Sequence, residues 1–354
     1  MKVQSIHLKH FKKFRDKKVS FTNPDTGLAK DLIVLIGSNG SGKSTILQTI
    51  AAMLGTATRQ LAQPADLDWP GFNLEMADKS WQLPGQVELQ VEFGQDELDA
   101  TREFARKVPG LSNKNITDPG NSTSIKMMLQ DGQVAIGKNT KPEQFQFRGR
   151  EYAKQIQKFV PASAAFKRVG GVFWYTEIRN ATSLMPFSDE DKTTFEILRS
   201  RLIFLSVFHK DILDGRMSLR PEQRDVYGSL EQAYKAIFPN RSFEGSVPQT
   251  EIGQLLDTPR FYLYDGKRQY ELSEMSGGER AIFPLIFDFA NWEIHNSVIL
   301  IDEIELHLHP PMQQGLLRAL KHLGQNNQFI ITTHSDAVES IVSEDAIIRL
   351  EEGD

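Results

Sequence analysis

The sequence contains no cysteine among its 354 residues. Disulfide bonds, a catalytic thiolate and cysteine metal sites are therefore excluded. Long apolar runs are also missing, since runs such as 298–301 fall far short of the ~20 residues that cross a bilayer. The N-terminus is charged and lacks the apolar segment of a signal peptide. We therefore expect a soluble, cytoplasmic protein without a membrane partner.

An excess of basic charge is missing as well. Lys and Arg number 41 against 46 for Asp and Glu, which gives a net charge of −5. This balance argues against a globally basic nucleic-acid binder but leaves room for a local basic patch. Hydrophobic residues make up 40% of the chain, so a chain of this length can bury a substantial core.

Hydrophobic patterning predicts an α/β protein. Apolar strands are expected at 31–36, 298–301, 329–332 and 346–350, and the last three alternate with helical segments. That alternation favours a parallel sheet with crossover helices. Outside this part of the chain, we expect a helix at 44–54 ended by Gly55, helices near 190–213 and 221–238, and hairpins at 125–136 and 261–272. Residues 56–85 and 137–168 carry few periodic signals.

A glycine-rich loop follows the strand at 31–36 and precedes a helix. Its residues fit the pattern G-x-x-x-x-G-K-[ST], in which backbone N–H groups and a helix N-terminus surround phosphate oxygens. Lys43 is expected to reach the β- and γ-phosphates, and the Ser44 hydroxyl to bind Mg²⁺. The predicted nucleotide-binding residues here are Gly37, Ser38, Asn39, Gly40, Ser41, Gly42, Lys43, Ser44 and Thr45.

Two adjacent carboxylates end the strand at 298–301. Asp302 is placed to hold Mg²⁺, directly or through water, and Glu303 is the expected general base for the attacking water. Two weaker signals lie nearby in sequence. Ser276, Gly277, Gly278 and Glu279 can present a hydroxyl and glycine amides at a helix N-terminus, and His334 follows the strand at 329–332.

Together these four elements resemble, in order and spacing, the ABC-type ATPases of the SMC/RecF/OLD branch. The resemblance identifies 37–44 with Walker A, 276–279 with the ABC signature, 298–303 with Walker B and His334 with the switch histidine. It implies a P-loop NTPase with an ABC-ATPase head, a mixed β-sheet lobe and an inserted helical lobe. It also implies a homodimer or higher oligomer around ATP and Mg²⁺, in which the signature acts on the partner's nucleotide and His334 contacts the γ-phosphate.

The same resemblance suggests a division of the chain. Residues 1–55 and 260–354 would form the nucleotide-binding core, residues 56–180 a β-rich insertion, and residues 181–259 a helical lobe. The opening residues and the run Glu303–Pro310 look OLD-like, but the chain ends about 20 residues after His334, so we expect no TOPRIM nuclease. The family glutamine after the strand 172–175 is replaced by Thr176 and Glu177, which leaves its role unassigned.

Two further features allow alternative interpretations. His307 and His309 could bind metal, but packing typical of the family explains them more simply because no third ligand is evident. Lys12 and Lys13 belong to a basic N-terminal stretch that could attract nucleic acid or approach the bound nucleotide; a solvated strand face is the simpler interpretation.

Two functions are therefore in competition. One is an ATP-dependent switch that controls a separately encoded nuclease or toxin in bacterial antiphage defence. The other is a RecF-like clamp that binds DNA ends or gaps. A transporter subunit is opposed by the long spacing between Walker A and the signature, and a GTPase by the lack of an N-K-x-D motif.

Overall fold

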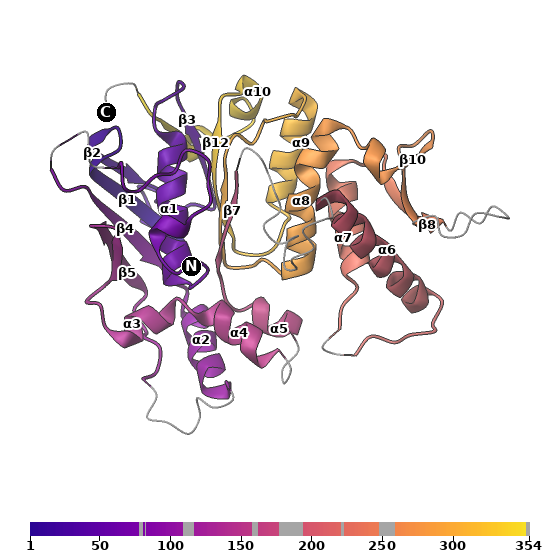
Figure 1. Ribbon diagram of the computed structural model, residues 1–354, viewed down its shortest axis with the longest axis horizontal. Helices are drawn as coiled ribbons and strands as arrows, with labels where there is room; N and C mark the ends of the chain where they lie inside the picture. The colour runs from indigo at the N-terminus through magenta and orange to yellow at the C-terminus, as the bar shows by residue number, and fades with distance from the viewer. Residues whose placement is uncertain are drawn as a thin grey trace. The chain divides into compact units, whose positions relative to one another are not determined.

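The computed structural model describes residues 1–77, 81, 83–108, 117–157, 162–176, 194–220, 223–247 and 259–351 (Figure 1). The chain divides into two compact units. The first unit comprises Met1–Glu177, Ile294–Glu305 and Gly324–Asp354, and the second comprises Ile178–Glu293 and Leu306–Leu323. Each unit is therefore assembled from segments that lie far apart in the sequence.

The first unit contains two sheets. The antiparallel sheet has the order β2 (Phe14–Ser20), β1 (Lys2–Phe11), β4 (Gln86–Glu92), β5 (Ser124–Gln130) and β6 (Gln133–Ile136). The parallel sheet has the order β13 (Ile347–Arg349), β3 (Leu32–Ile36), β12 (Gln328–Thr333), β11 (Val298–Ile301) and β7 (Val172–Tyr175). The parallel pairing confirms the sheet that the alternating pattern predicted.

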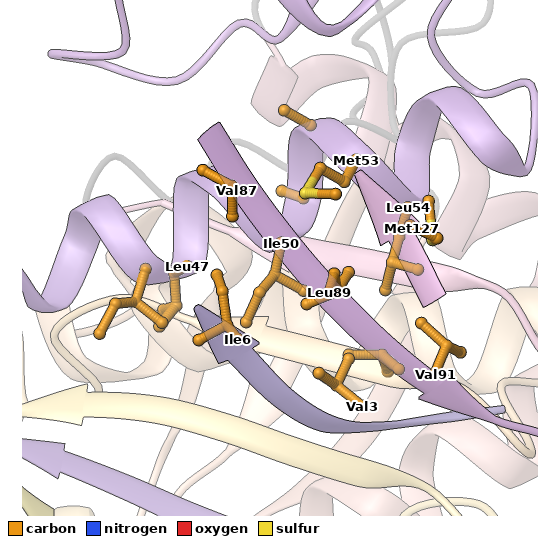
Figure 2. Packing of buried hydrophobic residues seen from close by; sticks show 14 of the residues in the cluster. Val3, Ile6, Leu47, Ile50, Met53, Leu54, Val87, Leu89, Val91 and Met127 are labelled. Carbon is orange, nitrogen blue, oxygen red and sulfur yellow. The ribbon is translucent and has the colours of Figure 1, made fainter. Parts of the chain in front are cut away.

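Helix α1 (Lys43–Ala57) lies between these two sheets (Figure 1). One side of the antiparallel sheet contributes alternate residues such as Val87, Leu89 and Val91, which are fully buried. Figure 2 shows Leu89 beside Ile50 of α1, in a cluster that also holds Leu47, Val87 and Val91. Burying an aliphatic side chain of this size contributes about 1.5–3 kcal/mol. This core fixes α1, and with it the loop at its start.

The other helices of the first unit are shorter. They are α2 (Gln95–Lys107), α3 (Lys141–Gln146), α4 (Gly149–Ile156), α5 (Ala162–Phe166) and α10 (Asp336–Glu339), with single 3₁₀ turns η1 (Pro64–Asp66) and η4 (Glu344–Ala346). Helices α2, α4 and α5 share a second core that includes Phe104, Tyr152 and Ile156.

The second unit combines helices with a small sheet. Its helices are α6 (Thr194–Leu213), α7 (Val226–Ile237), α8 (Gly277–Trp292) and α9 (Pro310–Leu320), with the 3₁₀ turn η3 (Leu272–Glu274). Its antiparallel sheet has the order β10 (Gln269–Glu271), β9 (Arg260–Tyr264) and β8 (Ser242–Val247). The predicted hairpin at 261–272 corresponds to β9 and β10. Tyr234, Phe243 and Phe261 form part of an aromatic core.

Two local predictions need correction. Gly55 does not end α1, because the helix continues to Ala57 with Thr58 as its C-cap. A Cβ at Gly55 would lie 2.8 Å from Leu61 Cδ1, so the glycine makes room for the chain folding back beside the helix. The helix expected at 221–238 begins at Val226, capped by Asp225, and Pro221 lies outside the described residues.

Candidate functional site: a phosphate-loop cavity

The glycine-rich loop connects β3 to α1 in a conformation that depends on glycine. Gly42 has φ 96°, and a Cβ there would lie 2.2 Å from Phe14 Cζ. Gly40 has φ 77°. Both values fall in the left-handed region that side chains disfavour. Helix α1 begins at Lys43, and the first N–H groups of any helix lack acceptors within it. The loop therefore ends in a set of donors suited to phosphate oxygens.

Lys43 is buried within this loop, with 5% of its surface exposed. Its Nζ donates to the carbonyl oxygens of Gly37 and Ser38, each at 2.9 Å, and approaches Ser41 Oγ at 3.5 Å. Burial lowers the pKa of Lys43, and the carboxylates of Asp302, Glu303 and Glu305 oppose that shift. The lysine is thus a buried cation held beside three acidic groups.

Ser44 and Asp302 meet although they lie far apart in sequence. Ser44 Oγ donates to Asp302 Oδ1 at 3.1 Å, and Thr332 Oγ1 donates to the same oxygen at 2.6 Å. Parallel pairing brings the ends of β3, β11 and β12 to one edge, which explains the meeting. Hydroxyl and carboxylate oxygens are ligands that Mg²⁺ prefers, so this donor set fits the ion.

The residues after β11 and β12 are linked to each other. Glu303 N–H donates to Thr332 Oγ1 at 2.7 Å, and Glu303 has φ 47°. Glu305 accepts from the His334 N–H at 2.6 Å and from Thr333 Oγ1 at 2.7 Å. A non-glycine residue held at positive φ is often found at functional sites. Sequence reasoning missed Thr332 and Glu305; the polar pair that ends the β12 strand could have indicated the first.

A cavity of about 300 Å³ lies at this edge, entirely within the first unit. We call it the phosphate-loop cavity. Its lining residues are Lys12, Lys13, Asn39, Gly40, Gly42, Lys43, Ser44, Thr45, Glu303 and His334. All ten belong to the set predicted from sequence. Gly37, Ser38 and Ser41 instead contact the Lys43 ammonium, and Asp302 contacts Ser44.

The two N-terminal lysines reach the cavity differently. Lys13 Nζ donates to the Gly40 carbonyl at 2.8 Å. Lys12 Nζ donates to Gln48 Oε1 at 2.9 Å and lies 5.2 Å from the centre of the Phe72 ring, and burial lowers its pKa. Both lysines are therefore tied to the phosphate loop or to α1. The sequence suggested this placement as one of several alternatives.

The predicted signature lies in the second unit, at the start of α8. Ser276 is the N-cap: its Oγ lies 3.3 Å from the Glu279 N–H, and its own N–H donates to Glu279 Oε2 at 2.9 Å. Gly277 has open space where a Cβ would stand. Gly278 does not, because a Cβ there would lie 2.7 Å from Met312 Cε. The turn thus exposes Ser276 and Gly277 and buries Gly278.

Glu279 is 2% exposed and is held by partners that the sequence did not indicate. Its Oε1 accepts from Tyr234 at 2.7 Å and from Tyr270 at 2.5 Å, and it pairs with Arg241. Burial alone would raise the pKa of Glu279, but these donors outweigh it and lower the pKa to about 2. We call these four residues the Glu279 network.

Three further sequence predictions concern a metal site at His307 and His309, the residue that follows Thr176, and membrane-spanning helices. Within the described ranges, no three His, Asp, Glu or Cys side chains gather as a metal site, and the His307 carbonyl lies beside Gly278. Glu177 lies outside the described residues, so the residue after Thr176 is not placed. No helix in the described part of the chain is both long and apolar enough to cross a bilayer.

Comparison with known proteins shows which families and which fold this chain resembles. Residues 1–158 match a family model described as "AAA ATPase domain", and residues 179–339 match one described as "AAA domain, putative AbiEii toxin, Type IV TA system". A solved SMC head bound to the C-winged-helix domain of ScpA has a TM-score of 0.53 at 16% identity, covering 99% of this chain and 94% of that one. This likeness confirms the predicted ABC-ATPase head fold with its mixed β-sheet lobe and helical lobe.

Two relatives match at the level of sequence. The "Retron Vc95 probable ATPase" of Vibrio cholerae is 25% identical over 398 residues, covering 100% of this chain and 74% of the relative. RecF, described as a DNA replication and repair protein, of Heliobacterium modesticaldum is 22% identical over 374 residues, covering 95% and 94%. Fold, motifs and relatives agree: the chain is similar to ABC-type ATPases of the SMC/RecF branch.

Proposed function

We propose that the chain binds Mg²⁺–ATP in the phosphate-loop cavity and hydrolyses it to ADP and phosphate. The observation that carries this proposal is the convergence of Lys43, Ser44, Glu303 and His334 on one cavity. Lys43 would supply positive charge to the phosphates, and Ser44 with Asp302 would hold the metal. Bound Mg²⁺ would neutralise charge that develops on the phosphate oxygens.

Glu303 is the proposed general base, and His334 the proposed contact to the γ-phosphate. Glu303 lines the cavity, and its backbone N–H donates to Thr332 Oγ1. His334 lines the same cavity, and Glu305 holds its backbone N–H. These supports matter because a general base acts only when it is held within hydrogen-bonding reach of the water.

We further propose that two copies close around ATP through the signature. Ser276 is exposed and Gly277 has open space around it, so both can approach a phosphate on a partner copy. The proposed output is control of a separately encoded effector, a nuclease or toxin, in antiphage defence. The match to a retron ATPase across the full length of this chain supports that class of role.

A RecF-like DNA clamp is the second candidate. The observation that favours it is the RecF match, which covers nearly all of both chains. Lys12 and Lys13 are held at the phosphate-loop cavity, so they are poorly placed to form a separate DNA surface.

The ATPase proposal is tested with two variants and a control. Lys43→Ala removes the buried ammonium, so ATP affinity should fall about 100-fold, as measured by titration calorimetry. Glu303→Gln keeps the shape but removes the base, so ATP should still bind while turnover falls by about 10²–10⁴. Lys107→Ala, which removes an exposed lysine paired with Glu103, should change neither. Near-normal turnover by Glu303→Gln would show that the base is assigned wrongly.

The dimer proposal is tested at Ser276. Ser276→Arg places a large cation in the exposed turn, so ATP should bind but the Glu303→Gln background should stay monomeric in light scattering. Lys107→Ala in the same background changes an exposed lysine outside the signature and should still dimerise. Unchanged dimerisation of the arginine variant would refute the role of the signature in the partner's site.

The biological role is tested by affinity purification of tagged Glu303→Gln protein from its native host in the presence of ATP. Mass spectrometry and a nucleic-acid stain then distinguish the two candidates. A stoichiometric effector protein supports the defence switch. DNA with repair factors and without an effector supports the clamp.

A further inference from the structure

A second cavity, of about 440 Å³, lies in the first unit. Helix α1 runs from Lys43 to Ala57, about 20 Å at 1.5 Å per residue. The phosphate-loop cavity lies at its beginning and the second cavity at its end. The second cavity is lined by Thr56, Ala57, Arg59, Leu61, Ala62, Val134, Ile136, Gln144 and Arg148. We call it the arginine cavity.

The arginine cavity has two cations in its lining and no acidic residue. Within the described part of the chain, neither Arg59 nor Arg148 takes part in an ion pair. The Nε of Arg148 is buried and has no hydrogen-bond partner. Buried polar atoms are nearly always satisfied, so an orphaned guanidinium donor points to a missing acceptor.

Neighbouring groups do not supply that acceptor. Glu143 accepts from the Lys138 N–H at 2.9 Å and from Thr140 Oγ1 at 2.8 Å, which commits it to capping α3. Glu151, one turn further along α4, accepts from Gln155 at 3.3 Å through Oε1, and its buried Oε2 has no hydrogen-bond partner, so this carboxylate does not bond Arg148. Burial and the charge of Arg59 lower the pKa of Arg148, with Tyr152 and Glu151 opposing the shift. The two guanidinium groups therefore repel each other, and the charge of Glu151 offsets this repulsion only in part.

The backbone at Arg59 is also unusual. Arg59 has φ 61°, just after the C-cap Thr58 of α1. Glycine or asparagine normally occupies this kind of position after a helix, because a side chain is disfavoured there. An arginine in this disfavoured conformation suggests that its side chain has a use.

The Arg148 guanidinium is further preorganised by an aromatic contact. It lies 4.6 Å from the centre of the Phe145 ring. Stacking holds the planar group in place, which lowers the cost of binding an anion through its fork of N–H donors.

From the cavity and its charges we infer a second ligand site, which binds a phosphomonoester of nucleotide size. A phosphomonoester carries about −1.5 to −2 charges at pH 7, which matches two guanidinium groups. A carboxylate carries only one. The volume falls within the range of small-molecule sites, and Leu61, Ala62 and Val134 offer an apolar wall for a base or sugar.

This site does not depend on the proposed ATPase activity, because it uses none of the residues that line the phosphate-loop cavity. The same phosphate chemistry can come from two sources. One is a free nucleotide, and the other is the 5′ end of a nucleic acid.

The test uses the full chain carrying Lys43→Ala, which weakens nucleotide binding at the phosphate loop. Three probes are titrated by calorimetry: AMP, the 5′-phosphorylated thymidine dinucleotide, and the same dinucleotide without that phosphate. At least one phosphorylated probe should bind with one site per chain, and Arg148→Gln should weaken it about tenfold or more. Binding of AMP assigns the site to free nucleotides, and binding of the dinucleotide alone assigns it to nucleic-acid ends.

Two further variants separate a binding role from a structural one. Arg59→Gly removes one guanidinium but suits the positive φ, so binding should fall while the thermal midpoint stays equal or rises. Arg15→Gln removes an exposed arginine on β2 and should leave binding unchanged within about twofold. The proposal is overturned if no phosphorylated probe binds, if the dinucleotide without phosphate binds equally well, or if Arg15→Gln weakens binding as much as Arg148→Gln.

Discussion

The phosphate-loop cavity in the first unit and the signature turn in the second unit position their polar groups by different means. At the cavity, backbone topology positions the polar groups, because three parallel strands end at one edge. At the signature turn, the backbone is a helix start, and buried side chains hold Glu279 from elsewhere in the unit. The first arrangement depends on strand order, and the second depends on individual partners.

The two regions also differ in how many neighbours compensate a buried charge. Lys43 is surrounded by several carboxylates and by loop carbonyls, so losing one neighbour leaves others. Among the described residues, Glu279 has one cationic partner, Arg241, together with hydroxyl donors. A buried charge with one counter-charge is sensitive to loss of that partner. The signature turn should therefore be the more fragile of the two regions.

The largest expected effect comes from removing the counter-charge of Glu279. Arg241→Met leaves a buried carboxylate with only hydroxyl and backbone donors, so the free energy of unfolding should fall by about 3 kcal/mol. Chemical denaturation at neutral pH measures this change. Arg216→Met is the matched control, because that arginine is 67% exposed and its ion pairs with Asp211 and Asp214 should contribute at most about 1 kcal/mol. Equal losses in both variants would contradict the comparison.

The second prediction concerns the loss of folding stability in acid, which we expect at the signature turn through Glu279. The folded pKa of Glu279 is lowered to about 2, below its ordinary value near 4.5. Stability from its ionisation is therefore fully present above pH ~4.5 and is lost as the pH falls toward 2, by up to about 3 kcal/mol. Denaturation curves between pH 5 and 2.5 measure this loss.

Glu279→Gln is the variant that isolates this contribution. It should be less stable at neutral pH but should lose less stability as the pH falls, because the titrating group is gone. A variant with the same pH dependence as the wild type would assign the acid sensitivity to other carboxylates.

The contrast also explains what could be predicted from sequence. Lys43, Ser44, Asp302 and His334 each follow or end a predictable apolar strand, so strand order alone brings them to one edge. Arg241, Tyr234 and Tyr270 stand at no fixed spacing from Glu279. Their meeting depends on the packing of α7, β8, β10 and α8, which local patterns do not encode.

Short helices leave little periodic signal in the sequence. The segment 137–168 is an example, because its helices α3, α4 and α5 span only a few residues each. The capping box of Thr140 and Glu143 with Pro142 at the second helical position marks the start of α3. Gly55 predicts a helix end that the structure does not have. This glycine lies inside α1, where it allows Leu61 to pack closely against the helix.

The smallest expected effect concerns the phosphate-loop cavity. Thr332 is fully buried and joins Asp302 to the Glu303 N–H through one hydroxyl. Thr332→Val keeps the shape but leaves that N–H without its acceptor, so stability should fall by about 1–2 kcal/mol. If the cavity is held mainly by strand order, ATP affinity should change little, while turnover should fall because Glu303 is less well fixed.

Thr333→Val provides the matched comparison one residue further along β12. It removes the donor to Glu305 but leaves the hydroxyl between Asp302 and Glu303 in place. Titration calorimetry and steady-state turnover on both variants separate binding from catalysis. A loss of ATP affinity in Thr332→Val as large as its loss of turnover would mean that side-chain partners, and not strand order alone, position the phosphate-loop cavity, so that the two regions would be held by the same means.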